Sequence, residues 1–204
     1  PLREMTTESL EEPAEIFPIK PAPMYLLRRP MAGGSKAYQG AGFYTADNPA
    51  FGATITYRLK DSLRTDKQER QREEASRAKK GNDTPYPDWD KLKAEDRAES
   101  PAVYLTIRDE KENLVARLPA STSAGLHRAT WNFRYAGAGR RGGPMAVPGT
   151  YTVDLIKIDN NEIETLLEPV AFECVPMGMA EMTAKQRSET LAFQRETAEL
   201  QRVM

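Results

Sequence analysis

Apolar and polar residues alternate in several short stretches of the chain, which is the pattern of β-strands that bury one face. In residues 53–60 every second residue is apolar, so the residues between them, Thr56 and Arg58 included, are expected to face water. About seven such stretches, separated by turn signals, predict a mainly β fold: an antiparallel β-sandwich of the immunoglobulin-like or fibronectin III-like type. The stretches are residues 53–60, 102–108, 113–118, 127–134, 151–155, 163–167 and 170–174.

A tryptophan in the fourth stretch is expected at the centre of the core. Trp131 shares its face with Ala129 and Phe133, and an indole can fill the space between two sheets, burying about 150–250 Å². A platform for stacking a sugar ring is the alternative role for this side chain. The alternation favours the buried position. The expected structural core comprises Leu105, Ile107, Trp131, Tyr151 and Val153.

The alternation is interrupted by a highly charged segment at residues 61–99. Residues 66–80 contain no large apolar side chain, but they carry opposite charges three and four positions apart, each pair stabilising an exposed helix by about 0.2–0.5 kcal/mol. Gly81 is expected to end this helix, and a second short helix follows. We therefore predict a helical insertion between two strands. Its charge has two interpretations, a solvated hairpin of helices or a partner-binding surface.

Tyr86 and Trp89 are the aromatic residues of this insertion, and they lie in its proline-containing stretch. Exposed rings at these positions would bind a glycan by stacking on the sugar. Buried rings would instead pin the insertion to the sandwich. Tyr86 and Trp89 are therefore the candidate ligand-binding residues, with pinning as the alternative.

The last part of the chain predicts a helix. Thr183 and Gln186 have the spacing of a capping box, and strong helix formers follow as far as Met204 without a Gly or Pro stop signal. This helix either packs back on its own domain or continues, in a longer parent, into a coiled pair. The candidate partner-binding residues on it are Leu191, Phe193 and Leu200.

These patterns divide the chain into three parts. Residues 1–51 are expected to form an extended lead-in that packs on the sandwich, with a short helix over residues 7–16 and a glycine-rich loop. Residues 52–176 form the sandwich with its insertion at 61–99. Residues 177–204 form the C-terminal helix, which we expect to be truncated, and the absence of an initial Met leads us to expect that the native start is missing or processed.

Composition excludes several classes of function. The 204 residues carry 29 basic and 30 acidic side chains, and a net charge of -1 argues against a dedicated nucleic-acid binder. One cysteine and one histidine exclude an internal disulfide framework and a zinc site built from several cysteines. No apolar run reaches the length that spans a membrane, about 18 residues. We expect neither a metal nor a cofactor.

The candidate catalytic groups lack the partners that catalysis requires. His127 has no serine or cysteine nucleophile motif near it and is expected to be a half-buried structural residue. Carboxylates of the insertion, such as Glu95 and Asp96, lie in a polar segment with nothing to desolvate them. Residues 33–36 are similar to the end of a phosphate loop but lack the strand and helix that this loop needs. We predict no catalytic residue and no enzyme activity for this fragment.

Two groups of motifs carry a resemblance to known families. The strands from Val103 to Val153, with Trp131-Asn132 and the run at residues 147–151, resemble the immunoglobulin-like domain of flagellar hook-capping proteins, which usually has Trp-Asp where this chain has Trp131-Asn132. Residues 40–60, with the downstream Tyr-Pro-x-Trp motif, resemble the region after the repeats of sortilin-like, BNR (Asp-box) β-propeller proteins, often labelled glycosyl hydrolases. The Asp-box pattern itself is absent from this chain.

The resemblance implies a C-terminal fragment of an exported protein, located in the periplasm or outside the cell. Its expected function is that of a non-catalytic accessory or structural domain that packs against the upstream propeller or mediates protein–protein assembly. The alternative is a carbohydrate-binding module of a glycoside hydrolase. The expected partners are the parent's own propeller, a second copy bound through the C-terminal helix, and a glycan, with no nucleic acid and no membrane span.

Overall fold

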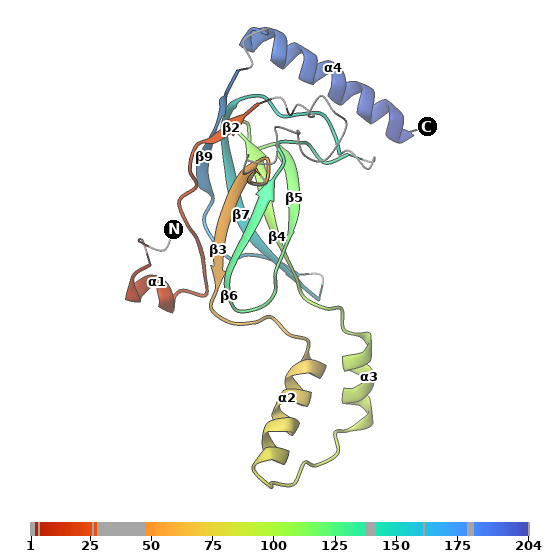
Figure 1. Cartoon of the computed structure of the whole chain (residues 1–204). Coiled ribbons are helices and arrows are strands. Elements are labelled where there is room, and N and C mark those ends of the chain that lie inside the picture. Colours follow the sequence, from red (N-terminus) through yellow and green to blue (C-terminus); the bar gives the residue numbers. More distant parts are fainter. Residues whose placement is uncertain are drawn as a thin grey trace, which may run out of the picture.

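Two β-sheets packed against each other form the body of the molecule, with a pair of helices projecting from one end and a long helix lying across the other (Figure 1). The prediction of a mainly β fold with a C-terminal helix is confirmed. The computed structural model describes residues 3, 5–25, 27, 48–137, 142–160, 162–178 and 182–203. The glycine-rich part of the predicted lead-in, including the phosphate-loop-like residues 33–36, lies outside the described residues.

The smaller sheet has three antiparallel strands in the order β1-β3-β6. β1 covers Ala14–Ile16, β3 covers Ala53–Leu59 and β6 covers Gly125–Trp131. β3 is the central strand: one edge pairs with β1 and the other pairs with the whole of β6, from Ala53 opposite Trp131 to Leu59 opposite Gly125. The outer edge of β6 therefore forms one boundary of this sheet.

The larger sheet has the order β2-β9-β7-β4-β5, with β8 paired to part of β7. All its pairs are antiparallel except β2 with β9, which run parallel. The sequence pattern did not predict this parallel pair, because β2 is only three residues long. The strand bounds are Ala22–Met24 for β2, Ala102–Asp109 for β4, Leu114–Ala120 for β5, Gly149–Asp159 for β7, Glu162–Thr165 for β8 and Val170–Pro176 for β9.

A cluster of aromatic rings fills the space between the two sheets. Trp131 is fully buried, and its ring meets those of Phe133, Tyr151 and Phe172 edge to face, with centroids 5.5, 5.0 and 6.2 Å away. The indole Nε1 donates a hydrogen bond to the Arg134 carbonyl at 2.9 Å, so its one polar atom is satisfied inside the core. The other expected core residues, Leu105, Ile107, Tyr151 and Val153, are also buried.

The outer face of β3 is only partly solvated. Thr54 and Lys60 are exposed as the alternation predicted, but Thr56 and Arg58 are buried, so the expectation is wrong for these two residues. The lead-in folds back over them: Arg58 Nη2 donates to the carbonyls of Ser9 and Glu12, the latter at 2.9 Å, and its Nε lies 3.7 Å from the Glu15 carboxylate. A period-two pattern identifies the two faces of a strand, but it gives no sign that a distant segment will cover the polar one.

Among the element boundaries that differ from the prediction, those of β6 and α1 have a clear local cause. β6 ends at Trp131, because Phe133 adopts the left-handed conformation with φ 59° while its carbonyl accepts from the Ala146 amide at 2.7 Å. The predicted helix over residues 7–16 is shorter: α1 spans Thr7–Glu11. Pro13 disfavours helix in the residue before it, so the chain continues as strand β1 instead.

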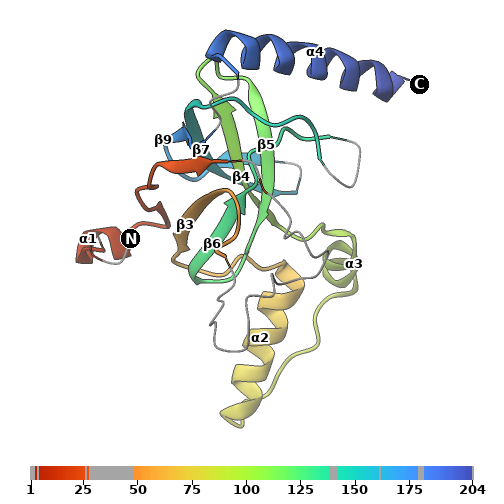
Figure 2. The same cartoon turned by 45° about the horizontal axis from the view of Figure 1, so that its top comes forward.

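Three further helices complete the fold. α2 (Asp66–Lys79) and α3 (Trp89–Arg97) lie between β3 and β4, and α4 (Ala184–Val203) follows β9. We call α2, α3 and the segment between them the helical hairpin. In Figures 1 and 2 the hairpin stands clear of both sheets, at the end opposite α4. None of the helices described is long and apolar enough to cross a bilayer.

Candidate functional site

The helical hairpin is a structured element that buries almost no apolar surface. α2 begins with a complete capping box. The Thr65 side chain accepts a hydrogen bond from the Gln68 amide at 3.2 Å, and the Gln68 side chain accepts one from the Thr65 amide. No residue of α2 is buried, and Glu95 is the single buried residue of α3. The hairpin is therefore held by caps and charges rather than by an apolar core.

Arg70 is the centre of the contact between the two helices. Its Nε lies 2.9 Å from each Glu95 oxygen, its Nη2 lies 2.8 Å from Glu95 Oε2, and its Nη1 lies 2.7 Å from Glu74. Lys67 adds a bond of 2.7 Å to Asp96. The Arg70 hydrogen bonds hold the pKa of Glu95 below its usual value, and Lys67 does the same for the pKa of Asp96. These carboxylates stay charged at neutral pH and are unsuited to donate a proton.

The two aromatic side chains of the hairpin are exposed. Tyr86 is 82% and Trp89 is 62% accessible, so the interpretation that they pin the insertion to the sandwich is wrong. Lys93 Nζ lies 5.5 Å from the centroid of the Trp89 ring, which leaves the opposite face of the indole for a ligand. Tyr86 borders a pocket of about 220 Å³ beside α2, together with Arg70, Arg77 and other polar residues.

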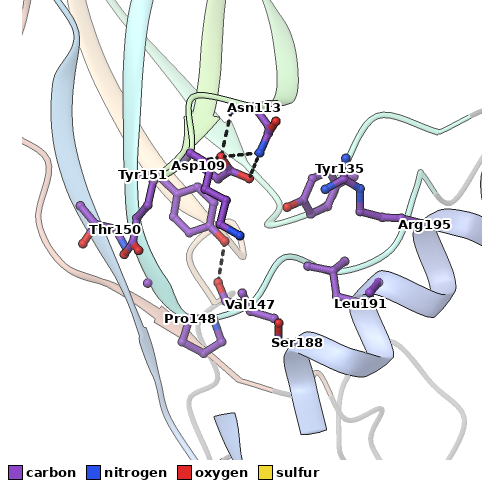
Figure 3. Close-up of a pocket in the computed structure, with 14 residues that line it drawn as sticks. Asp109, Asn113, Tyr135, Val147, Pro148, Thr150, Tyr151, Ser188, Leu191 and Arg195 are labelled. Carbon is purple, nitrogen blue, oxygen red and sulfur yellow. Dashed lines mark hydrogen bonds between the residues drawn. The ribbon is translucent and has the colours of Figure 1, made fainter. Parts of the chain in front are cut away.

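α4 covers a second pocket at the other end of the sandwich. This pocket, of about 400 Å³, lies between the helix, the β4–β5 turn and the start of β7 (Figure 3). Arg195 from α4 stacks over the Tyr135 ring, 5.0 Å from its centroid, and Leu191 packs against the core. Thr183 and Gln186 form the predicted capping box, with bonds of 2.8 and 3.3 Å. α4 thus packs back on the sandwich through one narrow face.

The polar groups of this pocket are already engaged in structural roles. Asp109 accepts from the amides of Lys111 and Asn113, both at 2.9 Å, which fixes the turn after β4. Glu110 accepts from the Thr150 amide at 3.2 Å, and the Tyr151 hydroxyl donates to the Val147 carbonyl at 2.6 Å. These bonds explain the shape of the pocket and leave no pair of groups placed for acid–base chemistry.

The outward side of α4 carries the other predicted partner-binding residues. Phe193 is 71% and Leu200 is 64% exposed, and they lie seven positions apart, which puts them on the same side of a helix. Leu191, predicted with them, points toward the sandwich instead. The structure therefore separates the three residues into an inner anchor and an outer apolar pair.

The remaining candidates for chemistry also have structural surroundings. His127 Nε2 lies 2.7 Å from the Ser123 carbonyl, and its ring packs near Tyr57 with the centroids 5.4 Å apart. Cys174 is buried, and burial raises the pKa of its thiol to about 12, which suppresses the thiolate that a nucleophile needs. Within the described part of the chain, no group of three His, Cys, Asp or Glu side chains is placed to hold a metal ion.

Sequence reasoning identified the hairpin and α4 but missed the pocket between α4 and the sandwich. Its residues come from four distant segments, and the local signals in them, such as the Pro148-Gly149 turn pair and the C-terminal helix, do not show that these segments meet. Comparison of the chain with protein-family models found no match, and comparison with curated proteins found none either.

Proposed function

We propose that this chain is a non-catalytic accessory domain that mediates packing or protein–protein assembly in a larger exported β-propeller protein. The observation that carries the proposal is the placement of two largely exposed helical elements, the hairpin and α4, at opposite ends of the sandwich (Figure 1). Of their described apolar side chains, Leu191 alone packs on the main core. Phe193 and Leu200 lie on the same outward side of α4, and an exposed apolar patch is typical of a surface that meets a partner.

We further propose that the sandwich is of the immunoglobulin-like type. The orders β1-β3-β6 and β9-β7-β4-β5 correspond to the strands A-B-E and G-F-C-C′ of that fold. The hydroxyl bond from Tyr151, near the start of β7, to the Val147 carbonyl corresponds to the tyrosine corner of the sixth strand, F. An experimental structure superimposed on immunoglobulin-like domains tests this assignment, and a different strand order would contradict it.

The parent protein is a proposal that rests on the sequence resemblance. We expect the reading frame upstream of Pro1 to encode blades with Asp-box repeats and, before them, an export signal. The corresponding propeller, produced separately, should bind this chain in titration calorimetry. An upstream frame without such repeats would contradict this parent, and a propeller that does not bind would contradict the packing role.

The outer pair on α4 supports assembly through this helix, with a second copy as the expected partner. Light scattering over a range of protein concentrations should detect dimers that the double substitution Phe193→Glu and Leu200→Glu abolishes. Gln194→Glu, an exposed neighbour on the same helix, is the matched control and should leave the dimer intact. A monomer at every concentration would contradict self-association.

The absence of enzyme activity has its own test. The carboxylates Glu95 and Asp96 are paired with cations, and the described residues offer no nucleophile with an adjacent base. We expect no turnover on a broad panel of glycosides and peptides. Turnover that follows the protein through purification, and that disappears when the carboxylates Glu95 and Asp96 are neutralised by substitution, would overturn this part of the proposal.

Glycan binding by the hairpin is the second candidate function, and the exposure of Tyr86 and Trp89 favours it. Trp89 offers one free indole face on which a sugar ring can stack, and Tyr86 borders a polar pocket whose side chains can bond sugar hydroxyls. A glycan array should then give signals that Trp89→Ala removes and Leu200→Ala, on the far helix, retains. Silence across the array would exclude this role.

A further inference from the structure

A groove runs along the outer face of the three-stranded sheet, away from both helical elements. It has a volume of about 510 Å³ and lies between the lead-in segment 18–23 and the outward side chains of β3 and β6. Lys20 and Arg128 are the charged side chains among its lining residues, and both are exposed without an ion pair or hydrogen bond to any described residue. The groove thus presents two uncompensated positive charges in a chain whose net charge is -1.

Hydroxyl groups complete the polar lining of the groove. Thr54 and Thr56 line its floor, and Thr54 Oγ1 lies 3.4 Å from Thr130 Oγ1 on the neighbouring strand. Among the described residues that line the groove there is no carboxylate side chain. Cations with neutral donors and no competing anion are the chemistry that binds a carboxylate.

The groove lies beside an open sheet edge. The amides of Phe17 and Lys60 bond to the carbonyls of Thr56 and Pro13, so the even-numbered residues of β3 direct their backbone toward β1. Its odd-numbered residues therefore bond to β6, where Ile55 pairs with Ala129 and Tyr57 with His127. The backbone groups of Leu126, Arg128 and Thr130 consequently point outward, and none of the described segments pairs with them. Such an edge is a template for another strand.

We propose that the outer edge of β6 binds an acidic, extended segment of a partner protein as an added strand. Residues directly opposite on neighbouring strands lie about 4.5–5.5 Å apart, so a residue of the added strand opposite Arg128 contacts its guanidinium. Two positions along, another residue faces Leu126, which is 46% exposed. The recognised sequence therefore places an acidic residue and an apolar residue two positions apart.

The sheet edge favours a peptide over an acidic polysaccharide. A peptide strand repeats its N–H and C=O groups at the spacing of β6 and satisfies the outward backbone groups, whereas a sugar chain has no such repeat. This site does not use the hairpin or α4. The inference consequently stands apart from the proposed function, and either can fail without the other.

The test uses the full chain and a fluorescent peptide with capped ends and the order Thr-Thr-Asp-Thr-Val-Thr-Thr. Fluorescence anisotropy should show binding that weakens with salt and that Arg128→Glu reduces by about tenfold, or about 1.4 kcal/mol. Lys20→Glu should weaken it less, because Lys20 belongs to the lead-in that follows β1 and β3 lies between β1 and β6. Arg117→Glu is the matched control, because Arg117 is an exposed arginine on β5 in the other sheet.

Peptide variants separate backbone pairing from charge attraction. A peptide with Lys in place of Asp should bind far more weakly, and N-methylation at alternate residues should abolish binding in the register that blocks the amides facing β6. Hydrogen exchange at Leu126, Arg128 and Thr130 should slow when the unmodified peptide is bound. Equal binding of every N-methylated peptide, tighter binding of an oligouronate, or no response to Arg128→Glu would each overturn the proposal.

Discussion

The sandwich and the helical hairpin are stabilised in opposite ways. The sandwich buries a continuous set of apolar side chains around Trp131, and its polar groups in the interior are few. The hairpin buries Glu95 and no apolar residue, and its two helices meet through the ion pairs of Arg70 and Lys67. Burial is non-directional and resists changes in solvent charge, whereas ion pairs depend on geometry, pH and salt.

The two regions also differ in whether their large side chains are buried or exposed. The sandwich turns its large side chains inward, and the hairpin leaves Tyr86 and Trp89 in water. Because the hairpin buries no apolar residue, substitutions of its outer residues should change the stability of the core little. The hairpin should also unfold and refold without the sandwich, since few contacts join the two.

The largest expected effect is on the sandwich. Trp131→Ala removes the ring that contacts Phe133, Tyr151 and Phe172, and it should lower the free energy of unfolding by about 3–5 kcal/mol. Urea denaturation followed by circular dichroism measures the loss. Trp89→Ala, the same substitution at the exposed indole, should change it by less than about 0.5 kcal/mol. Similar losses for the two variants would show that the exposed indole stabilises the fold as much as the buried one.

A smaller effect is expected from a single hydroxyl. Tyr151→Phe keeps the ring in the core but removes the bond to the Val147 carbonyl, and it should lower the free energy of unfolding by about 1 kcal/mol. Tyr104→Phe serves as the control, because the Tyr104 hydroxyl has no hydrogen-bond partner among the described residues. The free energies of unfolding of the two variants are measured by urea titration. Equal values would show that the Tyr151 hydrogen bond does not stabilise the fold.

Glu95→Gln should loosen the hairpin and leave the sandwich as it is. The substitution neutralises the carboxylate that binds Arg70 through three short contacts. Amide exchange should accelerate throughout α2 and α3, with no change in β4 or β7. Glu69→Gln is the control, because its pairs with Arg64 and Arg72, at 3.3 and 3.4 Å, are longer and exposed. Exchange that accelerates in both regions would show that they unfold together.

The hairpin should lose stability at acidic pH, whereas the sandwich should lose stability at alkaline pH. The pKa of Glu95 is lowered from 4.5 and that of Asp96 from 3.8. The ion pairs of these carboxylates therefore stabilise the hairpin fully above these values, and this stabilisation is lost as the pH falls below them. Burial raises the pKa of Tyr151 from 10.0 and that of Cys174 from 9.0, so the sandwich loses stability as the pH rises above about 9. The helical circular dichroism signal measured in acid reports unfolding of the hairpin, and the near-ultraviolet spectrum measured in alkali reports unfolding of the sandwich.

Local patterns were enough to predict the long strands and the helices. Alternation located β3, β4, β6 and β7, and the charge spacing with Gly81 located α2 and its end. These elements form from residues that are near one another in the sequence. Their patterns can therefore be recognised without knowing how the rest of the chain folds.

What the sequence could not predict depends on contacts between distant segments. Arg58 is buried because the lead-in folds over it from more than 40 positions away. The pocket beneath α4 joins Asp109, Tyr135 and Arg195, which no sequence spacing relates. The groove on the outer sheet likewise brings Lys20 and Arg128 into one lining, although they lie far apart in the sequence.

The hairpin and α4 leave the sandwich at opposite poles (Figure 2). Two binding partners, one at each pole, would occupy surfaces that do not overlap, and a rigid body separates them. Binding at one pole then changes the affinity at the other only if the sandwich itself adopts two states. Without such states, partners bound at the two poles would occupy their sites independently, and the occupancy at each pole would follow the concentration of that partner alone.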